Sequence, residues 1–267
     1  MSLVATILGC GSSAGVPRVG QGWGACNPDN PKNRRRRCSI LLERTGAAGR
    51  TTVLVDMSPD LREQLLGERV TRIDGVLVTH EHADHIHGID DLRPLALVMR
   101  RKLDVWADDK TAGYLNDRFG YCFETPPGSS YPPILIRRPM QIGVPVSIDG
   151  AGGSIEALPF DMLHGDTTAL GFRIGDLAYA SDVHAMPQES VAVLHDLDVL
   201  IIDALRYTRH PTHFNLDQAL ALIAEVKPRR AVLTNLHTDL DYDVLAAETP
   251  AHVVPAYDGL RIEVAYP

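Results

Sequence analysis

The sequence predicts an α/β protein in which two β-sheets pack face to face and helices cover their outer surfaces. About a dozen short runs of apolar and β-branched residues indicate strands, helical patterns lie between them, and 45% of the 267 residues are hydrophobic. A chain of this length buries roughly three quarters of its unfolded surface. Two packed sheets would bury that many strands in one domain, so we expect a single domain over residues 1–267.

The predicted strands follow one another at residues 4–8, 39–42, 52–55, 75–79, 155–158, 170–174, 177–180, 199–202, 231–234 and 260–264. Helical patterns occupy residues 59–66, 89–99, 187–195 and 216–226. Ser58 and Asn215 are candidate N-caps of the first and the last of these helices. The stretch 108–145 is rich in aromatic residues and proline, and we expect a lid or insertion there rather than core.

The composition excludes several classes of protein. The chain has 26 Lys and Arg against 34 Asp and Glu, a net charge of −8, whereas binding long nucleic acid requires a surplus of basic residues. The four cysteines, Cys10, Cys26, Cys38 and Cys122, are too scattered for a disulfide framework, so we expect a reducing, cytoplasmic compartment. No apolar run approaches the ~20 residues of a membrane span, and the amino terminus lacks the pattern of a signal peptide.

Four of the eleven histidines, His80, His82, His85 and His87, follow directly after the predicted strand at 75–79. Residues i and i+2 of an extended segment face the same way, so His80 and His82 can bind one cation together. Asp84 and His85 begin the next helix and can hold a second cation beside the first. Imidazole and carboxylate ligands suit Zn, Mn or Fe rather than Ca or Mg.

Further ligands are expected at the ends of other strands. His164 comes after the segment 157–160, Asp182 after 177–181 and His237 after 232–235, each at the end of a predicted strand. A lone histidine or aspartate of this kind is more often an ordinary polar residue, so these three are candidates only because the first cluster exists.

The run Thr79-His80-Glu81-His82-Ala83-Asp84-His85 resembles the HxHxDH signature of the metallo-β-lactamase superfamily, and the later candidates occur in the order of that family. The resemblance covers nearly the whole chain and implies a four-layer αββα sandwich with two divalent transition-metal ions, Zn or Mn. It implies one ion on His80, His82 and His164, a second on Asp84, His85 and His237, and Asp182 bridging both. Asp56 resembles the aspartate of that family that accepts a hydrogen bond from a metal-bound histidine.

Two further segments resemble the phosphodiesterase branch of this superfamily, which includes ribonuclease Z and a phosphoribosyl cyclic phosphodiesterase. Residues 8–17 resemble its glycine-rich opening loop, although a tight turn after the first strand is an equal reading. Residues 211–215 resemble its catalytic-histidine segment, so His213 is the candidate general acid, and His210 competes for that role. Cys26 and Cys38 lack the neighbouring cysteines that a structural zinc site of this branch needs.

The resemblance implies a dinuclear metal-dependent phosphodiesterase that acts on a small cyclic phosphate or nucleotide. A metal-bridging hydroxide would attack, Asp84 and Asp182 would position it, and His213 would protonate the leaving group. A ribonuclease Z-like nuclease, a thioester or lactone hydrolase of the same fold, and a metal-binding protein without catalysis are the alternatives. The basic run 34–37 would steer a phosphorylated substrate or would simply be solvated.

The expected partner is therefore a small phosphorylated molecule, with no membrane and no long nucleic acid, and relatives of this branch are often homodimers. The aromatic residues at 119, 121, 123 and 131 would either stack on a base or form a small core of their own.

Overall fold

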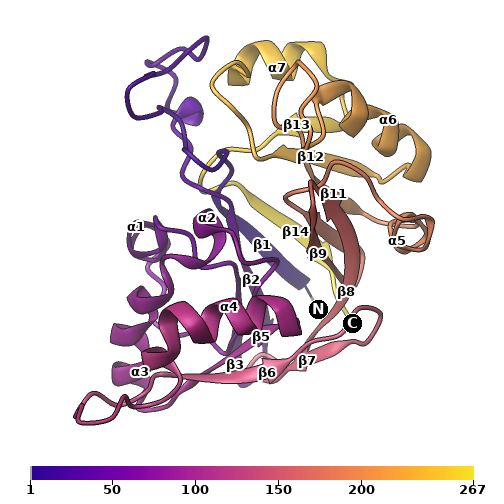
Figure 1. Ribbon diagram of the computed structural model, residues 1–267. Helices are drawn as coiled ribbons and strands as arrows, with labels where there is room; N and C mark the ends of the chain where they lie inside the picture. Colours follow the sequence, from indigo (N-terminus) through magenta and orange to yellow (C-terminus); the bar gives the residue numbers. More distant parts are fainter. Residues whose placement is uncertain (1) are drawn as a thin grey trace.

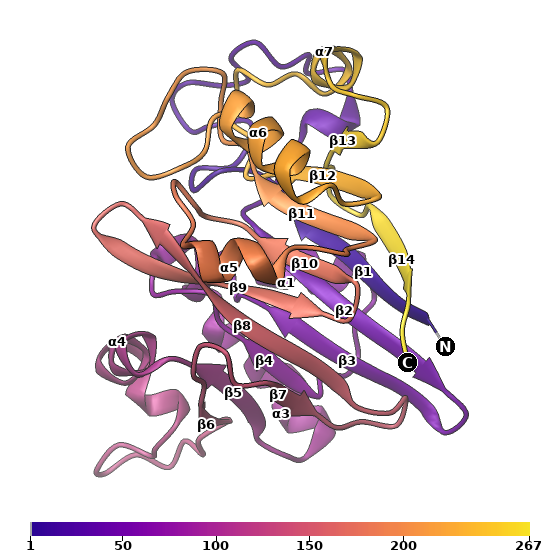
Figure 2. The same ribbon diagram turned by 90° about the vertical axis from the view of Figure 1, so that its right-hand side faces the viewer.

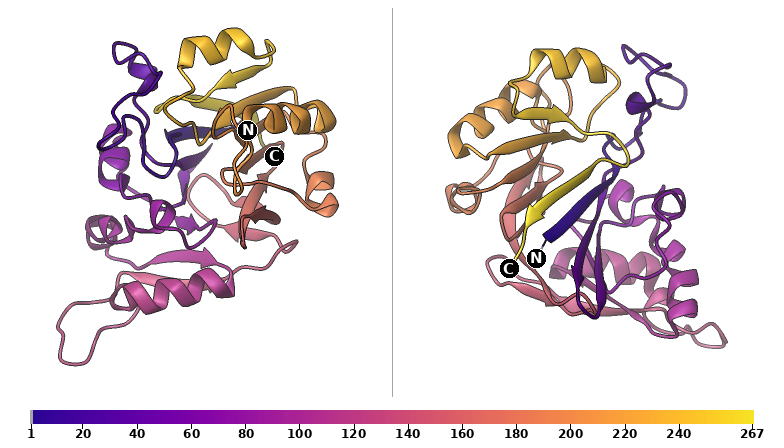
Figure 3. Two further views of the ribbon diagram at one scale, coloured as in Figure 1. Left: turned by 45° about the horizontal axis from the view of Figure 1, so that its top comes forward. Right: turned by 180° about the vertical axis from the view of Figure 1, so that it is seen from behind.

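The computed structural model describes residues 2–267 and consists of two seven-stranded mixed sheets that pack face to face (Figure 1). The strand order is β14-β1-β2-β3-β4-β5-β6 in the first sheet and β13-β12-β11-β10-β9-β8-β7 in the second. Strands β3 to β6 run parallel to one another, and so do β10 to β13, whereas the remaining pairs are antiparallel. The two described ends of the chain lie side by side because β1 pairs with β14 (Figure 3).

The strands are β1 (Ser2–Gly9), β2 (Ser39–Gly46), β3 (Gly49–Val55), β4 (Gly75–Leu77), β5 (Leu103–Ala107), β6 (Leu135–Pro139), β7 (Val146–Ile148), β8 (Ile155–His164), β9 (Thr167–Ile174), β10 (Leu177–Ala180), β11 (Val199–Asp203), β12 (Arg230–Thr234), β13 (Val253–Pro255) and β14 (Arg261–Ala265). The α-helices are α1 (Leu61–Gly67), α2 (Ala83–Ile86), α3 (Arg93–Met99), α4 (Asp109–Phe119), α5 (Gln188–Val193), α6 (Leu216–Val226) and α7 (Tyr242–Glu248). Short 3-10 helices occupy Pro31–Asn33, Ile89–Leu92 and Gly120–Cys122.

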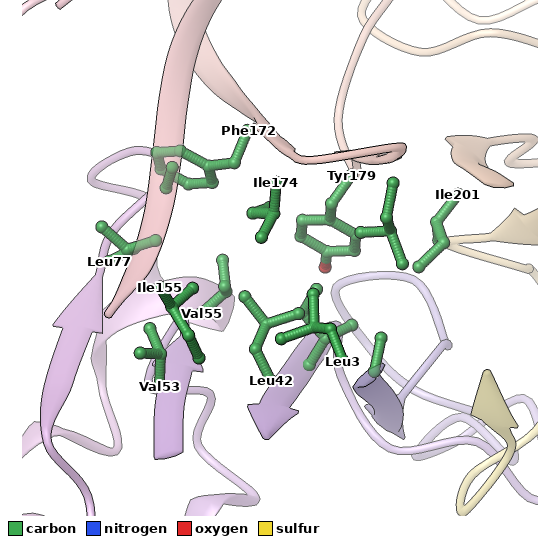
Figure 4. Close-up of a cluster of buried hydrophobic side chains, with 14 of the residues drawn as sticks. Leu3, Leu42, Val53, Val55, Leu77, Ile155, Phe172, Ile174, Tyr179 and Ile201 are labelled. Atoms are coloured by element: carbon green, nitrogen blue, oxygen red, sulfur yellow. The ribbon is translucent and has the colours of Figure 1, made fainter. Parts of the chain in front are cut away.

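Three clusters of buried side chains hold the layers together. The central cluster lies between the sheets, where Leu42 and Val55 of the first sheet meet Phe172 and Tyr179 of the second (Figure 4). A second cluster packs helices α1 to α4 on the outside of the first sheet, and a third packs α5 to α7 on the outside of the second (Figures 1 and 2). Because alternate residues of a strand face opposite ways, strands buried on both faces are mostly apolar, as β11 is up to its last residue, Asp203. The predicted αββα sandwich is confirmed.

Each predicted strand and helix overlaps an observed one, but four strands and two helices of several turns were not expected: β5, β6, β7, β13, α4 and α7. Asn215 caps α6 as predicted, in a capping box with Gln218. The N-cap of α1 is Asp60 rather than Ser58, whose hydroxyl accepts a hydrogen bond from the Asp60 N–H instead. Among the described residues, no helix is long and apolar enough to cross a bilayer.

The stretch 108–145 differs from the expected lid. Its helix α4 buries Ala112 and Leu115 against the outer face of the first sheet, and β6 is the edge strand of that sheet. Residues 124–133, between the last short 3-10 helix and β6, form a mostly exposed loop, and residues 141–145, between β6 and β7, form a second one. Proline and aromatic residues gather at this loop and at the end of α4, which is why the stretch resembled an insertion.

Candidate metal centre

The candidate ligands come together at one edge of the sandwich, at the ends of strands from both sheets. His80 and His82 lie between β4 and α2, and His164 is the last residue of β8. Asp182 follows β10 by two residues. His82, His164 and Asp182 line a cavity of about 320 Å³. Its walls are formed by Ser12, Ser13, Arg18, His82, Asp84, His164, Asp182, Leu205, Arg206, His210, Thr212, His213 and His237.

A first group of ligand atoms comes from His80, His82 and His164, whose ring nitrogens face one another. His82 Nδ1 lies 3.0 Å from His80 Nε2 and 3.2 Å from His164 Nε2. Two nitrogens bound to one zinc ion at about 2.0–2.1 Å in a tetrahedron are about 3.3 Å apart, so this spacing fits a metal site. Burial lowers the pKa of His80 and of His164, which favours the neutral imidazole that binds a cation. His164 Nδ1 donates to the Thr212 carbonyl at 2.7 Å, leaving Nε2 as the ligand atom.

A second group is formed by His80, His85 and Asp182, with Asp84 beside it. His85 Nε2 lies 2.8 Å from Asp182 Oδ2 and 3.4 Å from Asp84 Oδ2. Asp182 Oδ2 is buried and has no well-aligned hydrogen-bond donor among the described residues. Burial opposes protonation of His85, but the carboxylates around it outweigh burial and raise its pKa. Positive charge is therefore favoured at this position, and the donor set fits a divalent transition metal.

Asp56 fixes the orientation of His85, as predicted. It directly follows β3 in the left-handed region with φ of 66° and is fully buried. It accepts hydrogen bonds from Thr79 N at 2.8 Å and from His85 Nδ1 at 2.7 Å. A proton held on Nδ1 leaves Nε2 free to face Asp84 and Asp182.

His213 is held at the same cavity by Asp203, the last residue of β11. His213 Nδ1 donates to Asp203 Oδ2 at 2.8 Å. Burial favours the neutral ring, but the Asp203 carboxylate outweighs this and raises the pKa of His213 to about 9. His213 also forms a third group of possible ligands with His164 and Asp182, and its Nδ1 lies 3.5 Å from Asp182 Oδ1.

Asp203 and Asn235 are functional candidates that the sequence reasoning missed. Asn235 Nδ2 lies 2.8 Å from Asp182 Oδ1 and 3.2 Å from Asp203 Oδ1, so it ties the two carboxylates together. Like Asp56, Asn235 has a positive φ, of 60°. Both residues end or directly follow a predicted strand, so the strand-end rule that identified Asp182 would also have found them.

His237 lines the cavity but stands apart from the three groups of converging ligand atoms found among the described residues. Its Nε2 lies 2.5 Å from Arg18 Nη1, and its Nδ1 lies 3.2 Å from Asp239 Oδ1. His210 also lines the cavity, and its ring centre is 5.2 Å from that of His213.

Comparison with known proteins identifies the family. Residues 51–235, which contain all three groups of candidate ligands, match the model of the β-lactamase superfamily domain. The chain belongs to the β-lactamase superfamily. The resemblance predicted from the HxHxDH motif is thus confirmed, and with it the prediction of a hydrolase.

Three proteins similar to this β-lactamase superfamily protein have different names. The crystal structure of a diphosphatase from the PhnP family is 32% identical, has a TM-score of 0.89, and covers 99% of this chain and 98% of its own. A protein named octanoyltransferase from Porphyromonas gingivalis is 34% identical over 258 residues, which are 96% of this chain but 50% of the relative, so this chain spans half its length. Coenzyme PQQ synthesis protein B of Xanthomonas campestris is 25% identical over 313 residues, 97% of this chain and 99% of the relative.

The glycine-rich opening loop packs closely against the basic run in this superfamily protein. A Cβ atom on Gly9 would lie 2.0 Å from the Arg37 carbonyl oxygen, and one on Gly11 would lie 2.9 Å from that of Arg35. Glycine is therefore needed here for close backbone approach, while Ser12 and Ser13 of the same loop reach the candidate metal centre.

The basic run and the aromatic residues lie away from the metal centre. Residues 34–37 line a separate cavity of about 560 Å³, where Arg36 pairs with Asp258 and Arg37 with Asp60, both at 2.9 Å. The side chains at 119 and 123 pack against the outer core of the first sheet and do not form a separate core of their own. No cysteine takes part in the groups of possible metal ligands among the described residues.

Proposed function

We propose that this protein is a phosphodiesterase that hydrolyses a small cyclic phosphate or nucleotide with the help of two divalent transition-metal ions, Zn or Mn. The observation that carries the proposal is the position of His213, held by Asp203 at the wall of the cavity that the candidate ligands line. Cleaving a phosphodiester requires a proton for the departing alkoxide, and a positioned imidazole supplies one. The 32% identical relative is a diphosphatase, which supports phosphate chemistry.

The proposed ligands are those expected from the sequence: His80, His82 and His164 for one ion, Asp84, His85 and His237 for the other, and Asp182 between them. Divalent cations held there would act as Lewis acids and lower the pKa of water. Asp84 and Asp182 would orient the attacking water by accepting its hydrogen bonds. His213 would donate the proton on Nε2 to the leaving oxygen, while Asp203 keeps its Nδ1 proton in place.

Arg18 has a role in this proposal because it contacts His237 Nε2, the atom that would bind the second cation. When His237 binds a cation, the guanidinium must leave that nitrogen. Arg18 would then donate to a phosphoryl oxygen, for which its planar fork of N–H groups is suited. Arg206 lines the same cavity and adds a second positive charge to its wall.

The cavity favours a small substrate over a polynucleotide. Its volume of about 320 Å³ is at the lower end for ligand pockets, and the chain as a whole carries a net charge of −8. A ribonuclease Z-like enzyme would need an extensive basic surface for its RNA. In the basic run 34–37, Arg35 is buried, and Arg36 and Arg37 each form an ion pair with an aspartate. This run therefore offers little free positive charge to a nucleic acid.

The octanoyltransferase relative raises the alternative of acyl chemistry on a thioester. An octanoyl chain would need an apolar groove, but the cavity wall is formed by serine, threonine, histidine, arginine and aspartate, with Leu205 as its apolar member. That relative is also twice as long as the matched region, so its name does not transfer to this chain.

The test is turnover by metal-reconstituted protein on bis(p-nitrophenyl) phosphate, 2′,3′-cyclic nucleotides, a ribose cyclic phosphate, a lactone and a thioester. We expect hydrolysis of phosphodiesters, and we expect His213→Ala to lower it by about 10²–10⁴ without loss of metal. His210→Ala is the matched control, because its ring neighbours His213 but has no buried carboxylate partner. His82→Ala should instead remove metal and activity together.

Turnover confined to the lactone or thioester would overturn the proposed reaction. Loss of metal from His213→Ala would show that His213 is a ligand of the third group rather than the acid.

A further inference from the structure

Arg35 is a buried cation without a carboxylate partner among the ion pairs of the described residues. Its side chain is 2% exposed, and it donates from Nη2 to the Leu240 carbonyl at 2.7 Å and from Nη1 to the His237 carbonyl at 3.3 Å. Further contacts reach Asn33 Oδ1 at 3.3 Å and Cys26 Sγ at 3.9 Å. Burying a charge is costly unless polar groups compensate it, and here main-chain carbonyl oxygens of one loop do so.

The segment around Arg35 wraps the loop that follows β12 and carries His237. Ala25 N donates to the Thr238 carbonyl at 2.8 Å, and Asn33 Nδ2 donates to Asp241 Oδ2 at 2.6 Å. Figures 1 and 2 show this N-terminal segment, in indigo, at the same end of the molecule as α7. The guanidinium of Arg35 lies inside this contact and bonds to the carbonyls at both ends of the loop 237–240.

The main chain of Arg35 also holds the loop that carries Arg18. Arg35 and Val16 exchange two backbone hydrogen bonds, of 2.8 and 2.9 Å. Val16 is two residues from Arg18, whose guanidinium meets the His237 ring at the cavity wall. One residue therefore connects the two loops that face each other at the wall of the cavity.

We propose that Arg35 is a positioning residue that sets the place of His237 and thereby the affinity of the second cation site. The inference rests on the proposed function, in which His237 is a ligand of that site. Arg35 does not line the cavity of the metal centre, so its effect must pass through the loop 237–240. A planar guanidinium donates to two carbonyls at once in a fixed geometry, which a lysine ammonium does not reproduce.

The test compares Arg35→Ala with Arg34→Ala, a neighbour that is exposed and does not contact this loop. Metal affinity is measured by titration of the metal-free proteins with Zn²⁺ against a fluorescent chelator. We expect two Zn²⁺-binding steps in the wild type and in Arg34→Ala. In Arg35→Ala we expect the Zn²⁺ affinity of one step to fall by about 10–100-fold, with the other step unchanged. His237→Ala should lose the same step, and adding Arg35→Ala to it should cause little further loss.

Adding guanidinium ion to Arg35→Ala distinguishes loss of the Arg35 side-chain cation from general damage to the fold. Guanidinium ion at low millimolar concentration should restore the weakened step of Arg35→Ala, while equal urea should not. Unchanged affinity in Arg35→Ala would overturn the proposal, and so would equal losses in both binding steps.

If Arg35→Ala does not fold, the proposal is tested by measuring amide hydrogen exchange in Arg35→Lys. Faster exchange over 236–241 than in the wild type, with unchanged exchange over 80–87, supports the proposal, and equal exchange over 236–241 overturns it. A wild type that binds a single cation would refute the two-ion assignment of the proposed function, and the exchange comparison would still test Arg35.

Discussion

Asp56→Asn is a sharp test of the metal centre, because it alters one charge and leaves the volume of a fully buried side chain nearly unchanged. Asparagine also tolerates the left-handed backbone that Asp56 adopts. In the wild type, one carboxylate oxygen accepts from Thr79 N and the other from His85 Nδ1. An asparagine side chain has a single oxygen, so it satisfies only one of these donors.

The expected loss follows from these two arrangements. If the amide oxygen faces His85, a bond to a charged acceptor of about 1.5–3 kcal/mol becomes a neutral one of about 0.5–1.5 kcal/mol. The difference of about 1–1.5 kcal/mol corresponds to roughly tenfold in affinity. If the amide nitrogen faces His85, the ring must keep its proton on Nε2, the atom that would bind the cation, and the loss is greater. We therefore expect metal affinity to fall by about 10–100-fold.

Competition between protein and chelator for Zn²⁺ measures this loss, with Asp74→Asn as the matched control. Asp74 is 3% exposed and accepts from Thr52 N at 2.9 Å, much as Asp56 does from Thr79, but it lies outside the candidate ligand groups. Asp74→Asn should lower the free energy of unfolding while leaving metal affinity unchanged. An equal fall in metal affinity in both variants, or none in Asp56→Asn, would refute the reasoning.

Three further predictions concern the fold and its metal. Phe172→Ala removes a fully buried ring between the sheets and should lower the free energy of unfolding by about 3–5 kcal/mol in urea titrations, whereas Leu163→Ala, at a side chain 38% exposed, should cost far less. Asn215→Ala breaks the capping box of α6 and should cost about 0.5–2 kcal/mol, a loss that serine at the same position should largely avoid. A chelator should lower the melting temperature of the metal-loaded wild type and not that of His82→Ala, because a ligand of the folded state alone stabilises that state; equal melting temperatures of the wild type with and without chelator would contradict this.

The sequence predicted the elements whose pattern is local and missed those that depend on tertiary contacts. The first four residues of β11 are a continuous apolar run, and α6 has both a periodic apolar face and a capping residue. The β5 strand alternates buried and half-buried residues and was readable by the same rule, but the charged Asp104 interrupts its apolar run. The edge strand β6 has one buried residue, Leu135, so it has almost no apolar pattern to detect.

The ligand cluster after β4 could be predicted because four histidines and two carboxylates stand within eight residues. The partnership of Asp203 with His213 could not, because it joins a strand end to a loop ten residues away through one hydrogen bond. The contact of Arg18 with His237 spans 219 residues and follows no local pattern.

The site is built from both sheets, and this explains why its geometry depends on the core. His80, His82 and His85 follow a strand of the first sheet, whereas His164 ends one strand of the second sheet and Asp182 follows another. The distances between His82 and His164, and between His85 and Asp182, are therefore set by how the sheets pack across the central cluster. Protein interiors are close-packed and transmit small displacements, so a substitution in that cluster would change ligand spacing as well as stability. A cation shared by these residues would in turn connect the two sheets at their edge, which couples metal affinity to the stability of the fold.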